Sequence, residues 1–167
     1  AANIPPKLLL RDVVPVDAVP PDVRAPFLSM TTGSGVLRMN VALDELPDFT
    51  AKPGTHAQPH HASGILFAPT MAYMEQAYAD ARQFGTSRAP VIEMLIPSTL
   101  DETLAPKGKH VASLFVQYVA PRLPAPRSWE DPAEKEAFAD TVLEAVTRHA
   151  PNFSRAVVAR QILSPLD

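Results

Sequence analysis

The chain has 167 residues and a formal net charge of −3. This length predicts one ordinary domain, and the charge provides no cationic surface, so we expect no nucleic acid as a partner. The sequence contains no cysteine, which excludes disulfide bonds, a thiol nucleophile and Cys-ligated metal centres. Because it also shows no signal peptide and no apolar run of membrane-spanning length, it predicts a soluble, cytoplasmic protein.

The first half of the chain predicts an irregular lead-in followed by one strand. Residues 1–34 are rich in proline and predict an irregular course with one short helix near residues 21–30. In residues 36–43 apolar and polar side chains alternate, which predicts a strand with one apolar face. A loop that carries three histidines follows, and then a short apolar run at residues 65–69.

The second half predicts two helices and three strands. Residues 71–84 have Thr70 as N-cap, Gly85 as terminator and an apolar stripe, namely Met71, Met74, Tyr78 and Ala81. Two strands are expected within residues 90–97 and 109–121. The next helix has Asp131 as N-cap, Pro132 in its first turn and Glu134 as the acid of a capping box, and a final strand is expected in residues 155–163.

This order of elements predicts an α+β fold. It consists of a mostly antiparallel sheet with two helices on one face, in the ferredoxin-like β-α-β-β-α-β pattern with an insertion after the first strand. The other face of the sheet stays open, and the strand alternation places six side chains on it: Arg38, Asn40, Glu93, Ser113, Phe115 and Gln117. This mixture is too polar for a core, and fits either plain solvent surface or the wall of a cavity shared with another domain.

No complete catalytic or cofactor motif is found. Gly33 and Gly35 form only part of a dinucleotide fingerprint, and a strand follows where a helix should begin. His56, His60 and His61 could hold a metal, but no acid or cysteine accompanies them, so solvated loop histidines are the preferred interpretation. We therefore assign no catalytic, cofactor-binding or metal-binding residue in this chain.

The connection at residues 97–110 reads PSTLDETLAPKGKH, and its residues suit a turn. Asp101 can accept backbone N–H bonds, Pro106 restricts its own backbone, and Gly108 allows a positive φ. Ser98 can bond the backbone in the same way just past the preceding strand, and His110 begins the next one. We interpret the segment as a structural connector and not as an active-site loop.

Three stretches resemble the middle region of phytoene desaturase-like, FAD-dependent oxidoreductases of the flavin amine oxidase-like superfamily. They read MNVALDELPDF, EMLIPSTLDETLAPKGKHVASLFVQYVAP and EKEAFADTVLEAVTRHAPNFSRAVVARQILSPLD, and they occur in the family's order. The most specific part is P-S-x-x-D-x-x-L-A-P-x-G-x-H at residues 97–110. The resemblance implies that residues 1–34 lead in from a missing FAD-binding domain and that residues 35–167 form the substrate domain of a longer parent protein.

The resemblance also implies a function. The parent would remove hydride from a substrate C–H bond and pass it to FAD, while this fragment alone would be inactive and would bind no FAD. Its partners would be the missing FAD-binding domain and a small apolar or lipid-like substrate, for which a polyene, another lipid and an amine all remain open. The six open-face residues would line the substrate cavity.

A function of another class remains open at this point. The chain could be a free-standing ferredoxin-like binding or assembly module without catalysis, which the missing dinucleotide fingerprint favours. An exposed sheet face can also pair with a second copy of itself, so a homodimer is a further partner to consider.

Overall fold

The computed structural model describes residues 1–31, 33–54 and 56–167. The chain divides into two compact units, Ala1–Gly33 and Ser34–Asp167, and each is described by itself.

The first unit is mostly helical. It contains the short helix α1 (Pro6–Leu8), a π-helical turn over Leu9–Val13, a 3-10 turn over Val16–Ala18 and the helix α2 (Pro21–Ser29). The helix near residues 21–30 is confirmed, but the remainder is less irregular than the prolines predicted. The reason is that Pro6 and Pro21 occupy first-turn positions, where the missing N–H group has no helical partner to lose.

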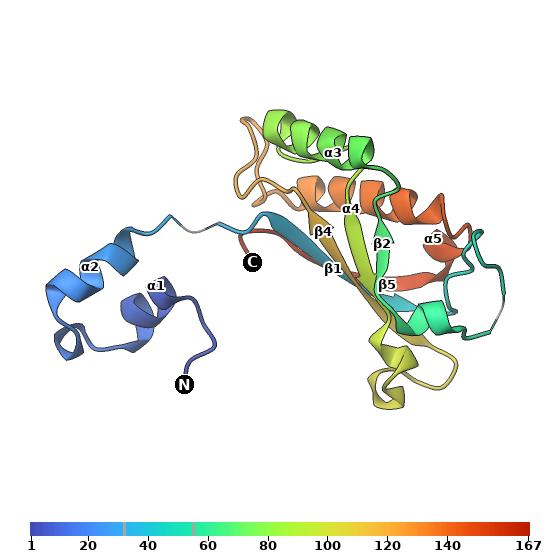
Figure 1. Ribbon diagram of the computed structural model, residues 1–167, viewed down its shortest axis with the longest axis horizontal. Coiled ribbons are helices and arrows are strands. Elements are labelled where there is room, and N and C mark those ends of the chain that lie inside the picture. Colours follow the sequence, from blue (N-terminus) through green and yellow to red (C-terminus); the bar gives the residue numbers. More distant parts are fainter. Residues whose placement is uncertain (32, 55) are drawn as a thin grey trace. The chain divides into compact units, whose positions relative to one another are not determined.

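The second unit is built on a five-stranded antiparallel sheet (Figure 1). Its strands are β1 (Val36–Leu43), β2 (Ile65–Phe67), β3 (Ile92–Leu95), β4 (His110–Gln117) and β5 (Val157–Leu163), in the order β2-β3-β4-β1-β5. The predicted α+β class with an antiparallel sheet is confirmed. The structure differs from the predicted pattern by one strand, because the short apolar run forms β2, which pairs with β3 at an edge of the sheet.

Two long helices lie on the same side of this sheet in Figure 1: α3 (Met71–Phe84) and α4 (Pro132–Thr147). Both N-caps are confirmed, since Thr70 Oγ1 accepts from the Tyr73 N–H at 3.1 Å and Asp131 Oδ1 accepts from the Ala133 N–H at 2.8 Å. A short helix, α5 (Phe153–Ala156), precedes β5 and was not predicted. Within the described part of the chain, no helix is both long and apolar enough to cross a membrane.

Two details of these helices differ from the prediction. On α3 the buried side chains are Ala77 and Asp80, whereas Met71 and Tyr78 of the predicted stripe are 72% and 47% exposed. Burial alone would raise the pKa of Asp80, but hydrogen bonds from Gln76 and from Arg88 together hold that pKa below its usual range.

On α4 the capping box is incomplete. The carboxylate of Glu134 accepts from Arg127 Nε at 2.8 Å, and Asp131 is the residue that caps the helix with its side chain. A short motif predicts which groups are able to bond, while the neighbouring chain decides which partner is closer.

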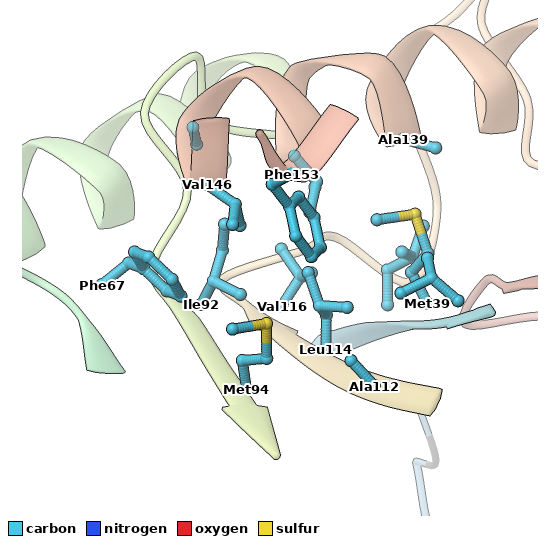
Figure 2. Close-up of a cluster of buried hydrophobic side chains, with 14 of the residues drawn as sticks. Met39, Phe67, Ile92, Met94, Ala112, Leu114, Val116, Ala139, Val146 and Phe153 are labelled. Atoms are coloured by element: carbon cyan, nitrogen blue, oxygen red, sulfur yellow. The ribbon is translucent and has the colours of Figure 1, made fainter. Parts of the chain in front are cut away.

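The hydrophobic core lies between α4 and the covered face of the sheet (Figure 2). From α4 it takes Phe138, Ala139, Val142, Ala145 and Val146. From the strands it takes alternate residues, which are Leu37, Met39, Val41 and Leu43 on β1, Ile92 and Met94 on β3, and Ala112, Leu114 and Val116 on β4. Phe153 of α5 also belongs to the core and is fully buried. The predicted alternation of the strands is therefore confirmed.

Leu114 lies at the centre of this core with no exposed surface, so its truncation tests the assignment of the faces. We expect Leu114→Ala to lower the free energy of unfolding by about 2–5 kcal/mol, because it removes buried methyl groups and leaves a cavity. The matched control is Leu100→Ala, since Leu100 is 76% exposed and its truncation should change stability by less than about 0.5 kcal/mol. Urea unfolding measures both, and equal losses would contradict the assigned faces.

Candidate functional site

The open face of the sheet brings all six predicted residues together. They occupy the strand positions between the core residues, and successive side chains of a strand point to opposite faces. Across the paired strands Arg38 and Glu93 both lie opposite Phe115, on its two sides, and Asn40 lies opposite Ser113. Strand pairing thus assembles one polar and aromatic surface from three segments that are distant in the sequence.

A directed chain of hydrogen bonds crosses this face. Arg38 Nη1 donates to Ser113 Oγ at 2.7 Å, and Ser113 Oγ donates to Asn40 Oδ1 at 2.8 Å. Asn40 Nδ2 then donates to Gln161 Oε1 of β5 at 3.0 Å. Ser113 and Asn40 each accept from one neighbour and donate to the next, so the chain holds the orientation of the Arg38 side chain.

Arg38 is also held by an aromatic ring. Its guanidinium carbon lies 5.3 Å from the centre of the Phe115 ring, which is within the range of a cation–π interaction. On the other side of Phe115, the Gln117 amide donates to the carboxylate of Glu93. Arg38 and Glu93 lie on opposite sides of Phe115, and the ion pairs among the described residues do not include one between them.

A hollow of about 540 Å³ lies over this part of the face. Its lining comes from four strands and the residue before β2: Arg38, Gly64, Ile65, Leu66, Glu93, Met94, Leu95, Ser113 and Phe115. Four of the six predicted residues line it. Asn40 and Gln117 do not, but each is hydrogen-bonded to a residue that does.

The sequence did not identify the contribution of β2 to this hollow. Leu66 and Leu95 are 59% and 55% exposed, and Leu66 belongs to a run too short to predict a face. Gln161 was also missed, because its place beside Asn40 depends on the pairing of β5 with β1. Alternation within β3 was the one available signal, and it places Leu95 on the same face as Glu93.

The chemistry offered by the hollow suits binding. It provides exposed apolar side chains, one guanidinium and one carboxylate, with several hydrogen-bonding groups around them. Dinucleotide cofactors are held where a parallel strand passes through a Gly-rich turn into a helix. Here the described strands pair antiparallel. Of the two described glycines with positive φ, Gly85 follows α3 and Gly108 lies in the connection between β3 and β4. The described residues therefore do not contain the dinucleotide-binding turn that would hold FAD.

The histidine loop differs from the predicted solvated loop. His61 is 1% exposed, and its Nδ1 accepts from the Gln58 N–H at 3.1 Å. With Nδ1 as the acceptor, the neutral ring carries its proton on Nε2, which donates to the Pro47 carbonyl at 2.8 Å. The solvated interpretation of His61 was therefore wrong. Its ring links the loop to Pro47, which follows β1, by a hydrogen bond.

His60 is half-buried. Its two ring nitrogens are enclosed and have no hydrogen-bond partner among the described residues, and its ring contacts Phe49 edge to face at 5.6 Å. Burial lowers the pKa of His60, and the neighbouring His61 and Lys52 lower it further. In residues 1–31, 33–54 and 56–167, no group of three or more histidine, cysteine or acidic side chains is placed to hold a metal ion.

The connection at residues 97–110 contains the predicted turn chemistry. Asp101 Oδ1 accepts from the Thr103 N–H at 2.9 Å, and Gly108 has a φ of 78°. Ser98 Oγ accepts from the Val111 N–H of β4 at 3.1 Å and lies 3.3 Å from His110 Nδ1. Its partner is therefore the strand after the connection, and not the backbone just past β3. Burial lowers the pKa of His110, with a further contribution from His61.

The enclosed ring nitrogens of His60 generate a prediction about pH. The pKa of His60 is lower in the folded chain than its value of about 6.5 in the unfolded chain, so the unfolded state takes up the proton first as the pH falls. We expect the free energy of unfolding to decrease as the pH falls through about 6.5, and to decrease less in His60→Leu. Urea unfolding at each pH measures this, and His56→Gln is the control because His56 is exposed. An unchanged slope in His60→Leu would contradict the assignment.

Comparison with known proteins gives curated relatives that include two rodent proteins, and no family model matches the chain. The chain is 39% identical over 166 residues to pyridine nucleotide-disulfide oxidoreductase domain-containing protein 2 of Mus musculus, and 38% identical over 166 residues to the protein of that name from Rattus norvegicus. Each alignment covers 97% of this chain but 28% of the relative. Over nearly its whole length, the chain is thus similar to just over a quarter of a protein whose name describes an oxidoreductase domain.

Proposed function

We propose that this chain is the substrate-binding domain of a longer FAD-dependent oxidoreductase of the dehydrogenase or desaturase type. The observation that carries the proposal is the hollow on the open face of the sheet. A sheet that packs helices on one face and leaves a half-apolar hollow on the other is suited to close a cavity against a second domain. The open face is then one wall of the substrate cavity.

The similarity to the rodent proteins supports this proposal. The matched segment is 28% of each relative, which leaves ample length for a separate cofactor-binding domain. The name of those relatives describes an oxidoreductase domain, and the described residues of this chain do not contain a dinucleotide-binding turn. We therefore place FAD, and the transfer of hydride to it, in the remainder of the parent protein.

The hollow favours a small apolar or lipid-like substrate. Leu66 and Leu95 leave more than half of their surface exposed. Covering exposed leucines with an apolar ligand removes their surface from water and therefore stabilises the complex. Phe115 adds an aromatic surface between them and Arg38. The phytoene desaturase-like sequence blocks agree with a polyene or another lipid as the substrate class.

The location of the cofactor is the first test of the proposal. We expect this chain alone to purify without flavin, because its described residues contain no parallel strand–turn–helix unit, and the full-length parent to bind about one FAD per chain. Visible absorbance and FAD release by denaturation measure this. Flavin in stoichiometric amount on the isolated chain would contradict the domain assignment. A full-length protein without flavin would instead favour the non-catalytic module.

The apolar wall can be tested with the isolated chain. We expect the neutral dye Nile red to bind the open face, and Leu95→Gln to weaken that binding by roughly 3- to 10-fold, because the substitution removes part of the apolar contact. The matched control is Leu100→Gln, since Leu100 is equally an exposed leucine but does not line the hollow. Fluorescence titration measures both. The same affinity in both variants would contradict the role of the hollow.

A further inference from the structure

We infer that Arg38 is an anion-binding residue and that the hollow takes an amphipathic monocarboxylate. The carboxylate head would bind the guanidinium of Arg38, and the apolar body would lie across Phe115, Leu95 and Leu66. This inference rests on the proposed function, because it names the ligand class for the same hollow.

Arg38 is oriented before any ligand arrives. Its Nη1 donates to Ser113 Oγ, which is fixed in turn through Asn40 to Gln161, and its guanidinium lies over the Phe115 ring. An arginine on a sheet surface normally loses side-chain freedom when it binds a ligand, and a preorganised one loses less. These contacts therefore increase the affinity of Arg38 for an anion.

The guanidinium retains capacity for an anion. It has five N–H donors in a planar fork, and the single side-chain hydrogen bond recorded for it among the described residues is the one from Nη1 to Ser113. None of the ion pairs within the described residues includes Arg38. A carboxylate can thus bind the remaining N–H groups in the two-point geometry that arginine prefers.

The distribution of charge gives the ligand a direction. Arg38 and Glu93 are the two charged residues that line the hollow, and Phe115 separates them. Glu93 accepts from Gln117 and repels an anion at its own side. An anionic head therefore lies at β1, above Arg38, and not at the Glu93 side of the hollow.

The apolar lining extends away from Arg38 across the strands. Phe115 is on β4, Leu95 on β3 and Leu66 on β2, so the surface runs about 14 Å from β1 over three strand spacings. A short fatty-acyl chain can lie across it with its head at the cation. The unpaired guanidinium at one end and the exposed leucines at the other are complementary to such a molecule in both charge and polarity.

The experiment compares decanoate, decanol and decylamine as probes for the isolated chain. Each is titrated below its micelle concentration, and the amide NMR shifts of Phe115 and Leu95 are followed. We expect decanoate to bind at least about 5-fold more tightly than decanol, and decylamine more weakly than either. This comparison uses the unaltered chain, so it does not depend on whether a variant folds.

Variants then test Arg38 itself. Arg38→Gln keeps a donor for Ser113 but loses the charge, and it should abolish the preference for decanoate over decanol. Arg38→Lys keeps the charge without the fork and should retain part of that preference. The matched control is Arg122→Gln, since Arg122 is exposed and does not line the hollow, and it should behave like the unaltered chain.

Several outcomes would overturn the inference: no binding of decanoate, equal binding of decanoate and decanol, a preference for decylamine, or an unchanged preference in Arg38→Gln. Equal binding would remove the role of Arg38 and leave the apolar wall of the proposed function intact. The proposed function is tested by a separate measurement that does not involve these probes. Absence of flavin from the full-length parent would contradict it.

Discussion

The antiparallel pairing of β1 with β4 is the constraint on which the rest of this unit depends. It places Leu37 opposite Val116 and Met39 opposite Leu114, so that both strands present their apolar residues to α4. Because side chains alternate along a strand, a slip of one residue would move every one of these side chains to the other face. The burial of Leu37, Met39 and Leu114 makes that slip costly, and the register is therefore strongly specified.

The same register creates the opposite face. When Met39 pairs with Leu114 under α4, Arg38 is necessarily placed beside Phe115 and Asn40 beside Ser113. The core and the candidate site are thus two results of one pairing. This connection explains how an exposed polar network acquires a defined geometry, since the buried residues on either side of each polar residue fix its backbone.

Several polar side chains on the open face are hydrogen-bonded to one another. Ser113, Asn40 and Gln161 use hydrogen bonds within the network, and Glu93 is bonded by Gln117. The guanidinium of Arg38 and the exposed apolar surface of Leu66 and Leu95 are available to a ligand. Each of the two has a different complement, an anion for the first and an apolar group for the second, and one amphipathic ligand provides both.

The histidine loop shows the limit of composition as evidence. Proline, glycine and histidine are typical of solvated loops, yet His61 is enclosed and bonded at both ring nitrogens, and His60 packs edge to face on Phe49. Phe49 is an apolar residue that follows β1 and belongs to the core, so the loop closes over it. A pattern within the loop could not indicate this, because the contact depends on an apolar side chain outside it.

The sequence by itself determined the features that depend on neighbouring residues. Alternation in residues 36–43 decided which side chains share a face, Thr70 and Asp131 marked the two helix starts, and Gly108 marked a turn. Each depends on hydrogen bonds or side-chain directions within a few positions of the chain, and local rules suffice for them. These rules were enough to name the six residues of the open face.

Tertiary structure alone decided which distant segments meet. It added β2 to the sheet and Leu66 to the hollow, and it placed Gln161 next to Asn40 at a separation of 121 residues. It also turned α3 so that Ala77 and Asp80, and not Met71 and Tyr78, face inward. Such outcomes follow from the packing of whole elements, in which the burial of all apolar side chains together selects one arrangement, and no short stretch of sequence contains that information.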